Sequence, residues 1–305
     1  MHLPIQSSIS QIDDNRWLIG QEHLYELVHS SLPKDAIAHW SDTAGRSFCI
    51  RKAKFTASST PCLPFYTAGD SAALWQFAGK IWKVKAAVPN MQMEGETIAL
   101  VTARFPDIPV PGVICHWMDS LCSKSFLVLE RAAGQTLDSA WASLAVSQRN
   151  MVASTIAGYV EELATVQSTR LETVSGLGLA DEIIQPRTAG SSGGPSLLQL
   201  SSLEQAREYF HPLEIKEEFV FSHGDLNPGN IMVDSLGRVT CFFEWKLAGF
   251  VPRWWIHFKA HLLAMQLSDA RYTKDWKIAL VQELEARGIV GDVQACPEWL
   301  AIGDP

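Results

Sequence analysis

The chain has 305 residues, of which 47% are hydrophobic and 19% charged, and its net charge at pH 7 is −8. This length allows a large core, and the acidic balance argues against nucleic acid or an anionic membrane as a partner, because both attract clustered Lys and Arg. There is no 18-residue apolar run, no signal-like leader and no C-x-x-C pair among the six cysteines, so we expect a cytoplasmic protein with reduced thiols.

The first third of the chain is predicted to contain an extension and a small strand-rich region. Residues 1–60 are interpreted as an N-terminal extension with a helix from Gln21 to Ser30. Residues 61–130 follow as a separate region, in which 73–85 reads as two strands joined by the turn at 78–80. Side chains of the second strand alternate between its two faces.

A helix and a third strand are predicted next. The run 93–101 has the composition of a helix opening, with Glu94 and Glu96 in its first turn, where acids also favour the helix dipole. Residues 125–130 form an apolar run that ends in the acid–base pair Glu130-Arg131 and continues through a Gly. We expect a buried strand here, followed by a loop into another helix.

The region 131–305 is predicted to be mainly helical. A long helix follows an N-cap within 147–150, with Met151 and Tyr159 on its buried face. The tail from Trp276 to Arg287 is predicted to be an amphipathic helix.

Two other patterns in this region are weak signals for chemistry. The sequence at 190–194 fits G-x-S-x-G, but it lies in a low-complexity loop and not between a strand and a helix. His257 and His261 are four residues apart and share a helix face, and we interpret them as stacked surface histidines because no acid lies between them.

The segment 219–233 is the most informative part of the chain. Asp225 and Asn230 lie five residues apart in a polar loop between two apolar, strand-like runs. Two ordinary turns would also contain Gly, Asp, Asn and Pro, but they require neither His223 nor an Asn at this offset. The runs 231–233 and 238–243, joined by an Asp-initiated and Gly-ended turn, predict a tight hairpin.

The sequence His223-Gly224-Asp225 with Asn230 resembles the catalytic loop of the aminoglycoside phosphotransferase-like family of small-molecule kinases, where Gly replaces the Arg of protein kinases. The resemblance covers about residues 35–265, and the leading segment is similar to that of fungal members. It implies an α+β, protein-kinase-like fold with two lobes, a small β-rich one at 61–130 and a mainly helical one at 131–305 that holds the catalytic loop 223–230.

The resemblance also implies roles around this loop. Asp225, with His223, is the expected catalytic group, and Asn230 and Glu244 are the expected ligands of Mg²⁺. The family's hairpin ends Ile-Asp-Trp-Glu, whereas here it ends Phe-Glu-Trp-Lys. The extra methylene of Glu244 moves its oxygens in a site that demands near-octahedral geometry. If phosphotransfer has been lost, Lys246 is expected to form a salt bridge with Glu244 in the place of the metal ion.

Four further residues are expected to contact the nucleotide. Lys83 is favoured over Lys85 as the phosphate-binding cation, although a solvated lysine pair is an equally good interpretation of either. Glu96 is favoured over Glu94 as the acid that orients this lysine. The backbone at Glu130 and Ala132 corresponds to the family's adenine-reading hinge. The expected phosphate loop, 67–73, contains a single Gly.

The predicted function is therefore ATP- and Mg²⁺-dependent transfer of a phosphoryl group to a hydroxyl of a small molecule. The alternative is a protein of the same fold that has lost phosphotransfer and either binds a secondary metabolite or performs non-phosphoryl acid–base chemistry on it. Glu244 and Lys246 favour the alternative, and the intact Asp225 and Asn230 favour the kinase. The acceptor and the oligomeric state are left open.

Overall fold

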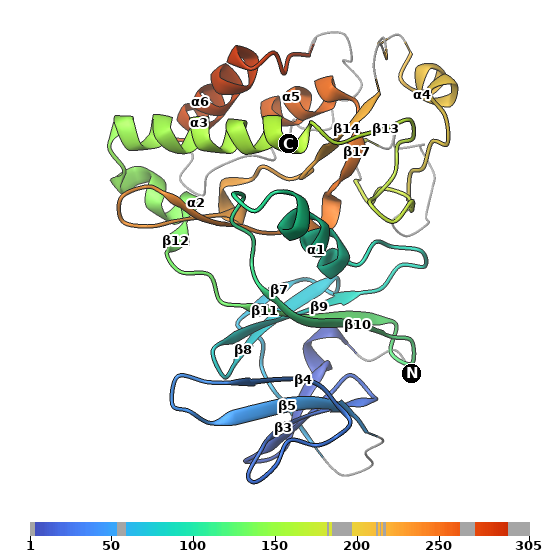
Figure 1. The fold of residues 1–305 in the computed structure, drawn as a ribbon, viewed down its shortest axis with the longest axis vertical. Helices are drawn as coiled ribbons and strands as arrows, with labels where there is room; N and C mark the ends of the chain where they lie inside the picture. Colours follow the sequence, from blue (N-terminus) through green and yellow to red (C-terminus); the bar gives the residue numbers. More distant parts are fainter. Residues whose placement is uncertain are drawn as a thin grey trace. The chain divides into compact units, whose positions relative to one another are not determined.

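The computed structural model describes residues 4–53, 59–181, 183–184, 197–211, 213, 215, 218–262 and 272–291. The chain divides into two compact units (Figure 1): unit 1 comprises Met1–Pro89 and Pro111–Arg131, and unit 2 comprises Asn90–Val110 and Ala132–Pro305. Within the described ranges, no helix has the length and apolar character needed to cross a membrane. The G-x-S-x-G sequence at 190–194 lies outside the described residues.

Unit 1 begins with a six-stranded antiparallel sheet in the order β4-β5-β3-β2-β1-β6. A single 3₁₀ turn, η1 (Ile5–Ser7), precedes it. The strands are β1 (Ile9–Asp13), β2 (Arg16–Ile19), β3 (His23–Leu27), β4 (Ala36–Ser41), β5 (Ser47–Lys52) and β6 (Thr60–Pro61).

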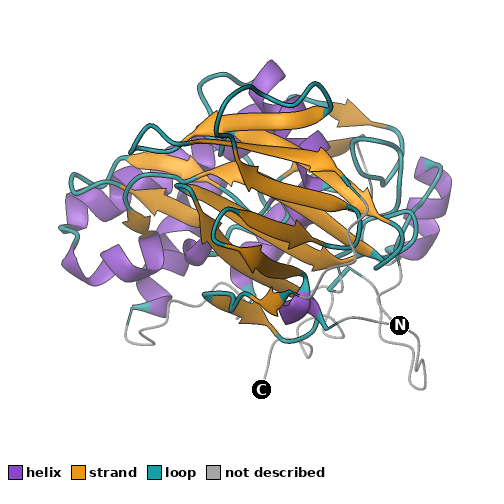
Figure 2. Ribbon diagram, turned by 90° about the horizontal axis from the view of Figure 1, so that it is seen from below, coloured by secondary structure: helices purple, strands orange, loops and turns teal. Residues whose placement is uncertain are grey.

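A second antiparallel sheet in unit 1 has five strands in the order β10-β11-β9-β8-β7, shown with the first sheet in Figure 2. They are β7 (Tyr66–Ala68), β8 (Ala72–Phe77), β9 (Lys80–Ala86), β10 (Val113–Asp119) and β11 (Lys124–Glu130). The two strands predicted within 73–85 and the strand predicted at 125–130 are confirmed. β9 lies in the middle of this sheet, between β8 and β11.

Both sheets contribute to one aromatic core of unit 1. The ring of Trp82 on β9 lies 5.0 Å from the ring of Tyr25 on β3 and 5.9 Å from the ring of Trp40 on β4. The predicted helix from Gln21 to Ser30 is wrong, because this segment contains β3. The neighbouring strands β2 and β5 pair with β3 on its two sides and satisfy its backbone, so tertiary pairing overrides the local pattern.

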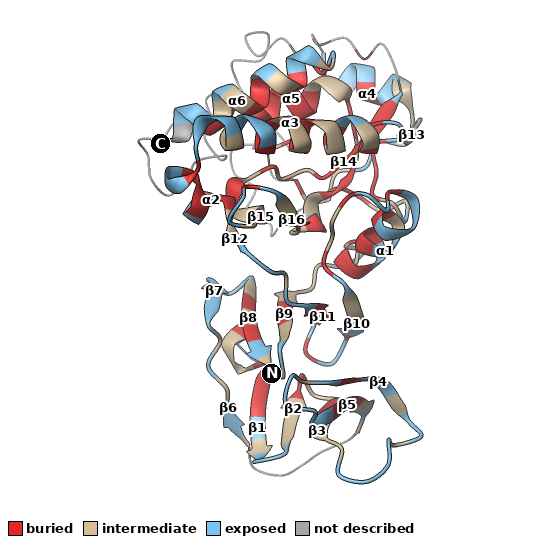
Figure 3. Ribbon diagram, turned by 60° about the vertical axis from the view of Figure 1, so that its left-hand side comes forward, coloured by how far each residue is buried: buried red, intermediate tan, exposed pale blue. Residues whose placement is uncertain are grey.

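Unit 2 holds all six α-helices of the described residues. They are α1 (Glu94–Arg104), α2 (Leu137–Ala140), α3 (Val146–Leu163), α4 (Leu203–Tyr209), α5 (Arg253–His261) and α6 (Thr273–Ala286). The helices predicted at 93–101, after 150 and at 276–287 are confirmed as α1, α3 and α6. The N-cap predicted within 147–150 is wrong, because α3 already begins at Val146 and Ala145 is its N-cap. Met151, however, is 42% exposed on α3 and is not a core residue as predicted. Most of α5 is buried (Figure 3), and it packs against α6.

Two small sheets and three 3₁₀ turns complete unit 2. One sheet joins β12 (Gln135–Thr136), β15 (Ile231–Val233) and β16 (Val239–Phe242), and the other joins β13 (Gln167–Ser168), β14 (Phe219–Ser222) and β17 (Gly249–Val251). The turns are η2 (Trp141–Ser143), η3 (Pro228–Asn230) and η4 (Trp245–Leu247). β15 and β16 pair as the predicted hairpin. A strand-built first unit and a mainly helical second unit give the α+β, protein-kinase-like fold that the sequence predicts.

Candidate functional site

The polar loop at 223–230 connects the buried strand β14 to β15 in unit 2. Its second half is the 3₁₀ turn η3, which begins at Pro228. Asn227 caps this turn, because its side-chain oxygen accepts the N–H of Gly229 at 2.9 Å. Proline suits the first position of such a turn, because its missing N–H has no partner there. The sequence Asn-Pro-Gly therefore specifies the local backbone that precedes Asn230.

His223 is completely buried and holds the start of this loop. Its Nδ1 accepts the backbone N–H of Asp225 at 3.2 Å, and its Nε2 lies 3.0 Å from the carbonyl oxygen of Phe243. These two contacts require the tautomer with the proton on Nε2. The ring stacks on Phe242 at 3.9 Å and meets Trp245 edge-on at 4.4 Å. Burial lowers the pKa of His223 to about 4, so the ring is neutral at pH 7 and orients the backbone at Asp225.

Gly224 adopts a conformation that few other residues tolerate. Its φ is +81°, and a Cβ at this position would collide with the carbonyl oxygen of Leu247. The Gly224 carbonyl accepts a hydrogen bond from the ammonium of Lys259 on α5. Lys259 is 8% exposed, and it also pairs at 2.8 Å with Asp181, a carboxylate that is 3% exposed. A buried ion pair therefore anchors the loop to α5.

Asn230 is fixed by both its backbone and its side chain. Its Nδ2 donates to the carbonyl oxygen of Asp225 at 3.3 Å, and its own carbonyl accepts the N–H of Phe243 at 3.0 Å. The bond from Nδ2 directs the amide oxygen the other way. Asp225 and Asn230 are thus brought together as the sequence predicts, and the Asn230 oxygen is the atom suited to a hard cation.

Glu244 follows β16 with its backbone in the left-handed region, at φ 69° and ψ 49°. Such a conformation is rare for a residue with a long side chain and marks a position that the surrounding structure constrains. Its Oε2 lies 3.7 Å from Nζ of Lys246, so the predicted salt bridge is confirmed. Both side chains retain contact with solvent, at 21% and 42% exposure, so the pair is held only weakly.

The two acids at the start of α1 have different surroundings. Glu94 is 8% exposed and accepts the backbone N–H of Trp245 at 3.1 Å, next to Glu244. The carboxylate of Glu96 accepts from the side chains of Gln92 at 2.6 Å and Ser175 at 3.1 Å. Glu94, and not the favoured Glu96, is therefore the acid of α1 that contacts the end of the hairpin.

The remaining predicted residues lie on or next to the five-stranded sheet of unit 1. Lys83 is 5% exposed in the central strand β9, whereas Lys85 is half-buried. Glu130 ends β11, where its carboxylate pairs with Lys80 at 2.6 Å and its backbone N–H binds the Gly112 carbonyl at 2.8 Å. Ala132, the first residue of unit 2 after this strand, is half-buried. The predicted phosphate loop is the tip of the β7–β8 hairpin.

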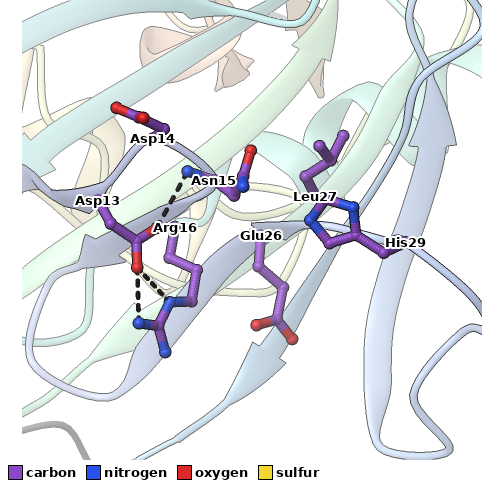
Figure 4. A pocket seen from close by; sticks show the side chains of 7 residues that line it. All are labelled: Asp13, Asp14, Asn15, Arg16, Glu26, Leu27 and His29. Carbon is purple, nitrogen blue, oxygen red and sulfur yellow. Dashed lines mark hydrogen bonds and ion pairs between the residues drawn. The ribbon is translucent and has the colours of Figure 1, made fainter.

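Lys259 and Asp181 are site residues that sequence reasoning did not find. A lysine in the aromatic-rich run of α5 is a detectable signal, because buried lysines need a partner. Asp181 carries no such signal, since only the folded chain brings it to Lys259. A hollow on the six-stranded sheet (Figure 4) is a weaker candidate: its Asp13 is exposed and already paired with Arg16 at 2.6 Å.

Residues 71–255, more than half of the chain, match the phosphotransferase enzyme family. A search of curated proteins found no significant match.

Similar solved structures include three aminoglycoside kinases. The first is an aminoglycoside-3′-phosphotransferase of type VIII (21% identity, 77% of this chain and 87% of that chain, TM-score 0.47). The second is APH(2″)-IIia with GDP and kanamycin (14% identity, 78% and 80%, TM-score 0.49). The third is APH(3″)-Id from Streptomyces rimosus with ADP and streptomycin (20% identity, 75% and 88%, TM-score 0.47).

Proposed function

Because the chain belongs to the phosphotransferase enzyme family, we propose that it transfers the γ-phosphoryl group of ATP to a hydroxyl group of a small molecule. The observation that carries this proposal is the network of hydrogen bonds that fixes the loop at 223–230. His223 and Asn230 hold the backbone of Asp225 from both sides, at 3.2 Å and 3.3 Å. A backbone held in this way suits a residue whose carboxylate receives a proton from the acceptor hydroxyl as the new P–O bond forms.

In this proposal the two polar loop residues have different roles. Asp225 is the catalytic base. His223 is a positioning residue, because its two ring nitrogens are engaged by the backbone of Asp225 and Phe243 and its ring is fully buried. A ring that remains neutral down to about pH 4 is not in its acidic imidazolium form at pH 7. The motif predicts both residues as catalytic, and the contacts of His223 favour this division.

The donor set near the loop fits a hard divalent cation. Asn230 offers an amide oxygen and Glu244 a carboxylate, and oxygen ligands of this kind are those Mg²⁺ takes. These two residues would hold the ion, which when bound neutralises charge on the phosphates. The salt bridge from Lys246 at 3.7 Å competes for the Glu244 carboxylate. The left-handed backbone of Glu244 offers one way to compensate for its extra methylene.

The nucleotide contacts are proposed on individual residues. Lys83, nearly buried on β9, is the proposed phosphate-binding cation, and the more exposed Lys85 is the alternative. Glu96 is the acid proposed to orient it, and Glu94 is the alternative; the Glu96 carboxylate also accepts hydrogen bonds from Gln92 and Ser175. The backbone carbonyl of Glu130 and the N–H of Ala132 are the proposed adenine contacts.

A second function is favoured by one specific observation. Glu244 and Lys246 form a salt bridge where the family places two acids, so a metal-poor site is the alternative. The protein would then bind a secondary metabolite, or perform non-phosphoryl acid–base chemistry on it, with the phosphotransfer function lost. Asp225 remains the first candidate for chemistry in that case.

Calorimetry of ATP binding with and without Mg²⁺ separates the two functions. The wild-type protein and the double variant Glu244→Asp/Lys246→Glu are titrated under the same conditions. The kinase proposal expects Mg²⁺ to strengthen ATP binding by the wild type, and expects Glu244→Asp alone to keep or raise activity. Binding that appears only in the double variant overturns it and supports the metal-poor alternative.

A further inference from the structure

A histidine pair and a carboxylate converge between α5 and α6, outside the site described above. Nε2 of His257 lies 3.1 Å from Oε1 of Glu285 and 3.4 Å from Nε2 of His261. The ligand atoms of all three residues lie within 4.8 Å of one another. The prediction that both histidines are on the surface is wrong for His257, which is 4% exposed and turns toward Glu285.

Protons alone satisfy this cluster poorly. The Nε2 of His257 is next to two groups, and a single proton there serves as donor to both the Glu285 oxygen and the His261 nitrogen. The other ring nitrogen, Nδ1, is buried and has no hydrogen-bond partner among the residues that the structure describes. If the proton moves to Nδ1, that N–H is unsatisfied and the lone pair of Nε2 faces a carboxylate. A cation at Nε2 would remove the conflict between this lone pair and the carboxylate, with the proton then on Nδ1.

The distances match those between the ligands of a tetrahedral metal ion. Imidazole nitrogens and carboxylate oxygens bind Zn²⁺ at about 2.0–2.2 Å, which places neighbouring ligands about 3.3–3.6 Å apart around a tetrahedron. The His257–His261 separation of 3.4 Å has this length, and the His257–Glu285 separation of 3.1 Å is slightly shorter. The Glu285 side chain is 49% exposed, so it can rotate to complete the third edge.

We propose that His257, His261 and Glu285 form a binding site for a divalent transition-metal ion of the Zn²⁺ type, which clamps α6 to α5. Two imidazoles and one carboxylate are a ligand set that zinc accepts, with a fourth position left for water or another ligand. Nitrogen ligands select Zn²⁺, Cu²⁺ or Ni²⁺ over Mg²⁺ and Ca²⁺, so this site differs in chemistry from the oxygen ligands at Asn230 and Glu244.

The surroundings set the strength and the consequence of binding. Lys277 lies on α6, as Glu285 does, and its positive charge acts on His261. Lys277 is therefore the nearby cation that opposes a bound metal ion. The clamped helix α5 also carries Lys259, whose ammonium binds the Gly224 carbonyl. A metal ion at this site would thus stiffen the element that anchors the loop at 223–230.

The test uses the full chain, treated with a chelator and then titrated with Zn²⁺ and with Co²⁺. We expect one ion per chain, visible tetrahedral Co²⁺ bands without thiolate charge-transfer absorption, and a Tm raised by a few degrees at saturating Zn²⁺. Mg²⁺ is expected to produce none of these effects. His261→Gln and Glu285→Gln should each weaken Zn²⁺ binding by at least about 10-fold, because each removes a ligand.

Two further variants keep this test decisive. His211→Gln changes an exposed histidine elsewhere in unit 2 and should bind Zn²⁺ as the wild type does. Lys277→Gln removes the opposing charge and should bind more tightly, a gain that a misfolded variant would not show. The proposal is overturned if the wild type binds no Zn²⁺, if the Co²⁺ spectrum shows thiolate ligands, or if His261→Gln and Glu285→Gln bind like the wild type.

Discussion

The pairing of His223 with Asp225 illustrates how far a motif can be interpreted from residues alone. The spacing of His, Asp and Asn predicts the loop and brings Asp225 and Asn230 together, as the structure shows. The division of roles is a property of the fold, because it depends on Phe242 and Trp245 enclosing the His223 ring. The choice between Glu94 and Glu96 is of the same kind, since it depends on how α1 is rotated about its axis.

Replacing Asp225 by Asn tests the proposed base. The substitution keeps the shape of the side chain and the backbone N–H that His223 accepts, so the loop should stay folded. We expect kcat to fall by about 10²–10⁴-fold or more, because general-base catalysis contributes this much, while ATP affinity changes little. Steady-state kinetics and calorimetry measure the two quantities. A variant with near-wild-type kcat removes Asp225 from the mechanism.

The protonation of His223 should make stability depend on pH. Its folded pKa of about 4 is below the ordinary value of 6.5, so the unfolded chain binds the extra proton first as the pH falls. The stabilisation is complete above about pH 6.5 and is lost between pH 6.5 and 4, by about 3 kcal/mol in total. We expect the NMR signal of His223 to titrate below pH 5, and titration near 6.5 would contradict the buried, neutral ring.

Helix α5 and strand β3 show what patterns predict at the scale of an element. The hairpin β15–β16 and the helices α1, α3 and α6 have strong local signals and are confirmed. The segment that contains β3 has Leu24 and Leu27 at a spacing that fits a helix, but pairing with β2 and β5 makes it a strand. The burial of α5, with Lys259 inside it, depends on packing against distant segments.

The ion pair between Lys259 and Asp181 should be costly to break from one side. Lys259→Met leaves the Asp181 carboxylate and the Gly224 carbonyl buried without the ammonium, and we expect a loss of about 3–5 kcal/mol in the free energy of unfolding. The double variant Lys259→Met/Asp181→Leu should lose less than the sum of the single variants. Urea unfolding measures the cycle, with the exposed Lys274→Met as the control.

Enzyme activity tests whether Lys259 also positions the loop at 223–230, in addition to stabilising the fold. Because Lys259 holds the carbonyl next to Asp225, Lys259→Met should lower kcat more than the affinity for ATP. Equal unfolding free energies for Lys259→Met and Lys274→Met would show that the ion pair contributes nothing to the anchoring of α5.

At the scale of the whole molecule, residue order predicts the succession of a strand-rich and a helical unit but not the composition of the first core. The family match begins at residue 71, and the preceding strands belong to unit 1 nonetheless. Their pairing order, β4-β5-β3-β2-β1-β6, is set by contacts between residues far apart in sequence. Such contacts leave no periodic signal in a single chain, which is why these residues are predicted as an extension.

The two sheets of unit 1 should therefore unfold together. The rings of Tyr25 and Trp82 come from different sheets and lie 5.0 Å apart at 59°, a geometry in which aromatic pairs contribute about 0.5–1.5 kcal/mol beyond their buried area. Each ring is 1% exposed, so Tyr25→Leu and Trp82→Leu should both destabilise the protein. Their double variant should show a coupling energy of about this size in a thermodynamic cycle.

Ile37→Ala, at a residue of β4 that is 52% exposed, is the control and should have little effect. In a shared core, removing one ring alters the contribution of the other to the free energy of unfolding. Additive losses from the two ring substitutions would therefore mean that the first sheet is a separate layer that the rest of unit 1 does not need.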